Sequence, residues 1–98
     1  MSYGAFNAVK HYTVSASTTT AATTITPGQK NIRIYNASAG VLFWRADRTA
    51  TAATSADCAM APSSVEVFNL PDDANVVSII LIAGTVSASV YFDTGYGI

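Results

Sequence analysis

The chain has 98 residues, the size of one domain, and only 11 % of them are charged, with a net charge of −1. It therefore lacks the clustered positive charge that nucleic-acid binding requires, and its longest apolar run, residues 76–83, is far too short to cross a bilayer. The single cysteine, Cys58, excludes an internal disulfide. We accordingly expect neither a nucleic-acid partner nor a membrane partner.

The predicted elements are short strands separated by turn residues, because no stretch repeats apolar residues every 3.6 positions. Residues 8–16 form the first predicted strand. The threonine-rich residues 18–26 continue in an extended conformation until a Pro-Gly turn at residues 26–29. Residues 31–35 alternate, with two isoleucines on one face and an arginine and a tyrosine on the other, which is typical of a strand with one buried face.

The middle of the chain contains the one long irregular stretch. Residues 36–40 have the composition of a five-residue hairpin connection, and residues 41–45 are expected to be the partner strand. The Ala/Thr-rich residues 46–63 show no strand pattern. Residues 65–70 then return to strand, before the Pro-Asp-Asp turn of residues 71–74.

The C-terminal part contains the most apolar strand. Residues 76–83 are apolar on both faces, which indicates a strand that is central in its sheet or covered. After a turn at residues 83–86, residues 87–93 alternate so that Val90 and Phe92 face the core.

These elements predict an all-β fold, a single-domain antiparallel β-sandwich that is jelly-roll-like, with about seven to eight short strands. The domain is expected to span residues 1–98, and residues 1–29 supply its first strand and the threonine-rich segment. Alanine, serine and threonine make up 39 of the 98 residues, so the core is thin for its length. Stability shared with another subunit is therefore expected.

The C-terminal TGYG, residues 94–97, is similar to a potassium selectivity filter and to a phosphate-binding loop. A filter needs surrounding membrane helices, and a phosphate loop needs a helix that follows it. The chain offers neither, so we predict a glycine-permitted bend that ends the last strand. Tyr96 and Ile98 would then seal the sandwich edge or reach a neighbouring subunit.

Catalytic and metal-binding motifs are weak. His11 is the only histidine and lies near no nucleophile motif, so we do not expect an enzyme. One histidine and one cysteine leave no zinc set, and residues 72–75 lack the pattern of a calcium loop. Asn36 begins a glycosylation sequon, but residues 1–10 carry no apolar signal segment, so secretion and glycosylation are not expected. No cofactor is predicted.

One cluster of residues is a candidate interface. Trp44, Arg45, Asp47, Arg48 and Asp57 place four charges beside the only tryptophan. Tryptophan and arginine are enriched at interface hot spots, and aromatic rings beside carboxylates also suit sugar binding. The third interpretation is a strand that ends in a polar loop, with the tryptophan in the core.

Residues 30–98 carry a resemblance to a known class of proteins. RIYN-ASAG-VLFWR, an Ala/Thr-rich loop and MAPSSVEVFNLPDDANVVSIILIAGTVSASVYFDTGYGI occur in that order. This order resembles small β-sandwich proteins of tailed bacteriophages, which act as head decoration (cement) proteins or head-fibre-like virion proteins. The matching patterns are residues 34–36, Pro62, residues 64–70, residues 82–85 and residues 95–98. The Pro-Ala-Gly of the pattern is Pro62-Ser63-Ser64 here.

The resemblance implies a non-enzymatic virion protein that binds the outer surface of an assembled capsid and stabilises it. Its partners would be the lattice of the major capsid protein and other copies of itself. Residues 76–82 offer more apolar surface than a thin single sandwich needs, so we expect a homotrimer or, as runner-up, a homodimer. It would be made in the bacterial cytoplasm and end on the capsid exterior. The alternative hypothesis is a carbohydrate-binding or host-adhesion module of a phage fibre, in which Trp44, Tyr35 and Tyr91 stack on sugars near Arg45 and Asp47.

Overall fold

A computed structural model describes residues 7–26, 28–49, 51–71 and 73–96. Within these residues the chain forms strands and no helix, which confirms the predicted all-β class. The strands are β1 (Asn7–Ala16), β2 (Ala21–Thr24), β3 (Asn31–Asn36), β4 (Leu42–Asp47), β5 (Cys58–Met60), β6 (Ser64–Asn69), β7 (Val76–Leu81) and β8 (Ala88–Tyr96).

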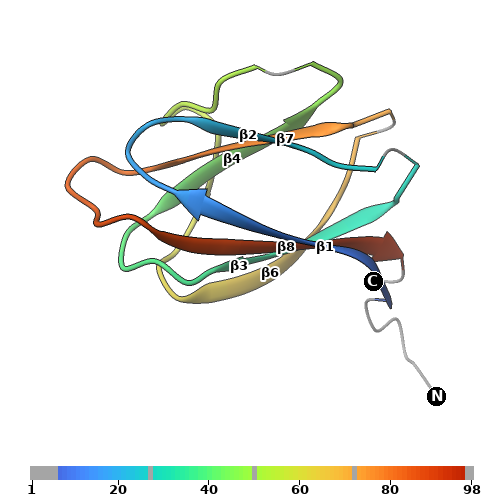
Figure 1. Ribbon diagram of the computed structural model, residues 1–98, viewed down its shortest axis with the longest axis horizontal. Coiled ribbons are helices and arrows are strands. Elements are labelled where there is room, and N and C mark those ends of the chain that lie inside the picture. The colour runs from blue at the N-terminus through green and yellow to red at the C-terminus, as the bar shows by residue number, and fades with distance from the viewer. Residues whose placement is uncertain (1–6, 27, 50, 72, 97–98) are drawn as a thin grey trace.

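The strands form two four-stranded antiparallel sheets that lie face to face (Figure 1). The order is β1-β8-β3-β6 in the first sheet and β2-β7-β4-β5 in the second. The first and last strands pair, and each sheet draws its strands from both ends of the chain. This order is that of a jelly roll, as the sequence predicted.

The core lies between the sheets and follows the two-residue period of the strands. β3 and β8 direct their isoleucine, valine and phenylalanine side chains inward, and Arg33, Tyr35 and Tyr91 therefore point outward. The largest fully buried apolar side chains are Phe92, Ile25, Ile32, Ile34, Leu42, Met60, Ile79, Leu81, Val77 and Val90.

The apolar strand β7 is central in its sheet, between β2 and β4, as its composition predicted. Its inner side chains, Val77 and Ile79 among them, belong to the core. On its outer face, Ile80 lies half-buried in a depression that is partly lined by residues 53–55 of the β4–β5 connection. The chain itself thus covers part of the apolar surface that suggested an oligomer.

The predicted hairpin at residues 36–40 is wrong. β3 pairs with β6 and β8, and β4 pairs with β5 and β7, so this segment crosses from one sheet to the other. Its composition favours a turn, but turn residues do not determine which strands pair. Asn36 is fully buried at the crossing and donates hydrogen bonds to the carbonyl oxygens of Gly40 and Ala61.

Two further predictions need correction. Residues 46–63, predicted to be irregular, contain β5, which pairs with β4 from Leu42 to Trp44. Residues 94–96, predicted to be a bend, belong to β8, because β1 and β3 flank that strand and supply ladder partners as far as Asn7 and Asn31. Of the predicted bend, residue 97 lies outside the described residues.

The turns before β3 and β8 are as predicted. Gly28 and Gly84 have φ angles of 91° and 88°, which side chains with a Cβ rarely adopt. In the turn before β7, Asp73 has a φ of 64°, and the amide of Ala74 donates to the carbonyl of Pro71 at 3.2 Å.

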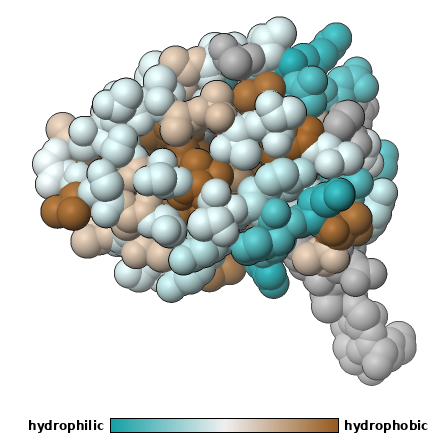
Figure 2. Space-filling view, viewed as in Figure 1, coloured by the Kyte–Doolittle hydropathy of each residue, from teal (hydrophilic) through white to brown (hydrophobic). Residues whose placement is uncertain are grey.

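The surface is weakly polar with apolar patches. In Figure 2, pale residues cover much of the visible face, brown apolar residues lie between them, and strongly hydrophilic residues gather on one side. The exposed large apolar or aromatic side chains are Val9, Tyr35, Val65, Ile82, Val86 and Tyr96.

Candidate functional site

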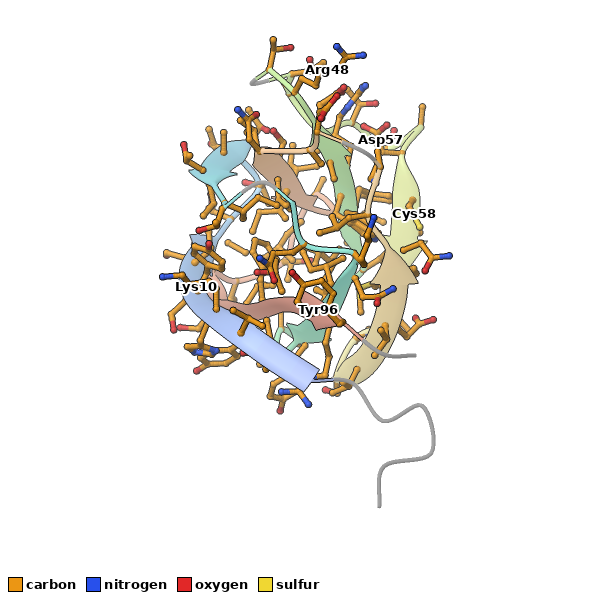
Figure 3. All side chains as sticks on the ribbon, turned by 90° about the vertical axis from the view of Figure 1, so that its right-hand side faces the viewer. Lys10, Arg48, Asp57, Cys58 and Tyr96 are labelled. Atoms are coloured by element: carbon orange, nitrogen blue, oxygen red, sulfur yellow. The ribbon has the colours of Figure 1, made fainter. Side chains whose placement is uncertain are left out.

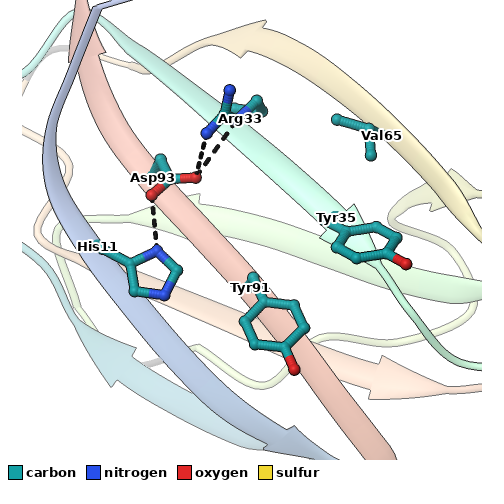
Figure 4. Close-up of a pocket in the computed structure, with 6 residues that line it drawn as sticks. All are labelled: His11, Arg33, Tyr35, Val65, Tyr91 and Asp93. Carbon is teal, nitrogen blue, oxygen red and sulfur yellow. Dashed lines mark hydrogen bonds and ion pairs between the residues drawn. The ribbon is translucent and has the colours of Figure 1, made fainter.

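The candidate site is a shallow depression on the outer face of the first sheet (Figure 4). It encloses about 550 Å³ and is lined by His11, Arg33, Tyr35, Val65, Tyr91 and Asp93. These side chains come from all four strands of the sheet, β1, β8, β3 and β6, and stand on the face opposite to the core.

The register of the strands arranges these residues in two rows. In one row, His11 on β1 lies opposite Asp93 on β8, which lies opposite Arg33 on β3. In the second row, Tyr91 lies opposite Tyr35, two residues along each strand. Opposed residues on one face of a sheet have Cβ atoms about 5 Å apart, so each row is a set of direct neighbours.

Asp93 is the centre of the polar row. Its Oδ2 accepts hydrogen bonds from Arg33 Nη2 at 2.8 Å and from Nε at 3.3 Å, and its Oδ1 accepts from His11 Nδ1 at 2.7 Å. Burial alone would raise the pKa of Asp93, but the hydrogen bonds and positive charge of its two partners outweigh burial and lower it. The site therefore contains a stable carboxylate.

The contact with Asp93 also fixes the tautomer of His11. A carboxylate only accepts, so the Nδ1 atom of the ring carries the proton. In the neutral ring Nε2 is then an acceptor, and the Thr13 hydroxyl donates to it at 3.3 Å. The imidazole is thus held at both of its nitrogen atoms.

The hydrogen-bonded chain of Asp93, His11 and Thr13 has the same order of groups as a Ser-His-Asp triad, with the hydroxyl of a threonine in the place of the serine hydroxyl. Acyl transfer would require donors for an oxyanion as well. β8 lies between β1 and β3, so its backbone N–H groups are engaged in sheet ladders on both sides. The arrangement therefore positions a histidine, and a non-enzymatic role stays our prediction.

The two tyrosines of the second row and the His11 imidazole of the first row form a set of three nearly parallel rings. The centroids of Tyr35 and Tyr91 are 5.7 Å apart with an angle of 22° between the ring planes, and those of His11 and Tyr91 are 6.1 Å apart at 18°. Figure 4 shows the two tyrosines side by side, with their hydroxyl groups turned the same way. Among the described residues, neither phenol hydroxyl has a hydrogen-bond partner.

Trp44, the aromatic residue of the predicted interface, does not belong to this depression. Trp44 points into the core, is 7 % exposed and packs on Phe68 with ring centroids 4.8 Å apart. It lies opposite Cys58 and Ile79 in the second sheet. Trp44 is therefore unable to stack on a ligand. Of the three interpretations of this cluster, the one with the tryptophan in the core agrees with the structure.

Three of the predicted interface residues do lie together, on the outer face of the second sheet. Arg45 Nη2 lies 2.7 Å from Asp47 Oδ2, and Arg45 Nη1 lies 3.7 Å from Asp57 Oδ1. Arg48 follows as an exposed residue after β4. Partly exposed ion pairs of this kind contribute about 0–1 kcal/mol to stability, so the cluster is a polar surface rather than a structural centre.

The C-terminal candidates are separate from that cluster. Figure 3 shows Tyr96 well away from Arg48 and Asp57, and Tyr96 is exposed at the end of β8. Ile98 lies outside the described residues. The predicted interface residues therefore belong to at least two different surfaces.

A second depression, of about 420 Å³, lies on the outer face of the second sheet. It is largely apolar and is lined by Thr18, Phe43, Ala53, Thr54, Ser55, Ile80, Leu81, Ile82 and Ala83. Its lining comes from β4, β7 and the connections β1–β2, β4–β5 and β7–β8, and none of the described residues that line it is charged.

The polar row of the first sheet was not predicted from the sequence. His11 was expected to lie in the first strand, without a link to Arg33 or Asp93. The available signal was alternation, because Arg33 and Asp93 each lie between two buried neighbours and His11 precedes the partly buried Tyr12. What the sequence lacks is the pairing of β1, β8 and β3, which joins positions more than 50 residues apart.

The described part of the chain holds no cluster of three or more side chains suited to a metal ion. It also contains no helix long and apolar enough to span a membrane. No family model, curated protein or solved structure matches this chain in the comparisons.

Proposed function

We propose that this chain is a non-enzymatic virion structural protein that binds the outer surface of an assembled phage capsid and stabilises it. The observation that carries the proposal is the surface, which combines few charges with large apolar or aromatic side chains left exposed on the first sheet and on the β7–β8 connection. Exposed apolar patches of this kind are typical of surfaces that contact other proteins.

Two further observations support it. The sequence order of residues 30–98 resembles phage decoration proteins, and the jelly-roll strand order is one that viral capsid domains use. A fold by itself does not determine function, so the surface and the resemblance carry more weight.

The mechanism would be mass action. A protein that binds only the assembled lattice lowers the free energy of that state, and about 2.7 kcal/mol per site results when its concentration is a hundredfold above Kd. If the protein is a homotrimer or homodimer, one molecule can contact several capsid subunits, and binding at the second contact is favoured by the high effective concentration.

Co-sedimentation tests this function. Purified protein is mixed with expanded capsids of the major capsid protein encoded beside its gene and, separately, with unassembled coat protein. We expect the protein to pellet with capsids alone. Two variants locate the contact surface. Ile82→Ser with Val86→Ser alters the β7–β8 connection, and Val65→Ser alters the outer face of the first sheet. Failure of the wild-type protein to pellet with capsids would refute the function.

A carbohydrate-binding module is the second candidate. Of the three rings that suggested it, Trp44 is buried, but Tyr35 and Tyr91 are adjacent on the outer face of the first sheet. Lectin domains also use the jelly-roll order.

A further inference from the structure

We propose that the depression on the outer face of β1, β8, β3 and β6 binds a neutral pyranose sugar, which lies over Tyr35 and Tyr91 and donates a hydroxyl hydrogen bond to Asp93. This inference rests on the second candidate function and is independent of capsid binding. It assigns a ligand class to a site whose polar residues, His11, Arg33 and Asp93, are absent from the predicted interface.

The two tyrosine rings supply an apolar platform. They are nearly parallel, neighbouring and partly exposed, and they stand on a sheet that holds their backbones rigidly. The face of an aromatic ring carries partial negative charge, so it attracts the polarised C–H groups on the apolar side of a pyranose ring. Their unpaired phenol hydroxyls are directed to the same side and can bond sugar oxygens.

Asp93 supplies a fixed acceptor beside that platform. A carboxylate offers about four lone-pair sites, of which Arg33 uses two on Oδ2 and His11 uses one on Oδ1. One site on Oδ1 remains for a sugar hydroxyl, and the side chain is 14 % exposed towards the depression. Because its two protein partners already hold the carboxylate, binding requires no reorientation of Asp93.

The charges of the site favour a neutral ligand. The guanidinium of Arg33 is matched by the carboxylate of Asp93, with which it makes two hydrogen bonds. A second carboxylate, such as that of a uronic acid, would approach Asp93 at close range and be repelled. An uncharged sugar meets donors and acceptors without this cost.

The size and shape of the site agree with one ring of a longer saccharide. Small-molecule sites occupy about 300–1,000 Å³, and the volume of this depression is about 550 Å³. It is open and shallow rather than enclosed, so a chain can continue beyond the bound ring.

The test is direct binding to simple sugars. Wild-type protein is titrated with methyl glycosides of glucose, galactose and mannose and with methyl glucuronide, by saturation-transfer NMR and calorimetry, to about 10 mM, a range that reaches millimolar Kd values. We expect at least one neutral glycoside to bind and the glucuronide to bind at least about tenfold more weakly, a difference of about 1.4 kcal/mol.

Matched tyrosine variants locate the site. Tyr35→Ala and Tyr91→Ala should each weaken binding by about two- to tenfold, because each removes half of the platform. Tyr96→Ala is the control, since Tyr96 is exposed to 44 % against 42 % for Tyr35 but lies outside the depression. It should leave Kd unchanged. Asp93→Asn should weaken binding by about tenfold through loss of the charged acceptor. Thermal melts confirm that each variant is folded.

Three results would overturn the inference. They are no binding of any neutral glycoside by the wild-type protein, equal losses in Tyr96→Ala and Tyr91→Ala, and preference for the glucuronide. If the wild-type protein ignores sugars but pellets with capsids, and Tyr91→Ala no longer pellets, the face is a protein contact. The sugar site is then refuted while the virion function stands.

Discussion

The hydrogen bonds of the Asn36 side chain are expected to contribute strongly to the free energy of unfolding. Asn36 is fully buried at the end of β3, where the chain crosses between the sheets. Its Nδ2 donates to the carbonyl oxygens of Gly40 and Ala61, both at 3.0 Å. Its Oδ1 accepts from the amide and the hydroxyl of Ser38, at 3.1 and 2.6 Å. All four hydrogen-bonding positions of the amide are therefore used.

Asn36→Asp keeps the shape of the side chain but removes both donated bonds. Each of the two carbonyl oxygens then loses one of its two donors, since the hydroxyls of Ser38 and Ser64 also bond to them. The larger cost is that a charge or a displaced proton enters a buried site. We expect the free energy of unfolding at pH about 7 to fall by about 3–5 kcal/mol. At pH about 4 the deficit should shrink, because a protonated carboxyl group can restore one donated bond.

Urea unfolding followed by the fluorescence of the buried Trp44 measures this change. The matched control is Asn69→Asp on β6, where the amide oxygen accepts one bond from Asn31 at 2.8 Å and the side chain is exposed. That variant should differ from the wild type by at most about 0.5 kcal/mol. An Asn36→Asp deficit no larger than that of the control would refute the role assigned to the amide.

Three further predictions concern stability. Thr94 is fully buried, and its hydroxyl has no hydrogen-bond partner among the described residues. Thr94→Val should therefore raise the free energy of unfolding by about 1 kcal/mol and Tm by about 4–8 °C, and a lower Tm would contradict this. A Cβ at Gly40 would collide with the side chain of Thr85, so Gly40→Ala should lower Tm, and unchanged calorimetric melts would show that the loops adapt freely. The pKa of Asp93 is lowered in the folded state, so its contribution to stability is complete above its unfolded value of about 3.9 and is lost as pH falls through the folded value. Urea titrations at several pH values should therefore show a steeper acid loss in the wild-type protein than in Asp93→Asn, and parallel curves would exclude this contribution.

The strands that alternate strictly were predictable from sequence, because side chains in a strand change face at every residue. Residues 31–35 and the inward-facing Val90 and Phe92 follow this rule. β5 was not predictable: its three residues, Cys58–Met60, lie in an Ala/Thr-rich stretch and become a strand only through pairing with β4.

The partners of each strand depend on contacts distant in sequence, which explains why the crossing at residues 36–40 was predicted as a hairpin. The same limit applies to the candidate site. Tyr35 and Tyr91 were identified as stacking candidates, but the register that joins them to His11, Arg33 and Asp93 is a property of three strands together. Three interpretations of Trp44 stayed open from the sequence, including the buried one that the structure shows, because proximity to charged residues does not reveal the face on which a side chain lies.

The most direct test of the proposed function is the heat stability of capsids measured against the concentration of this protein. If the protein binds the assembled lattice, the disassembly temperature should rise with occupancy and level off when the sites are full, as mass action requires. Capsids that bind the protein to saturation and still disassemble at an unchanged temperature would contradict a stabilising role.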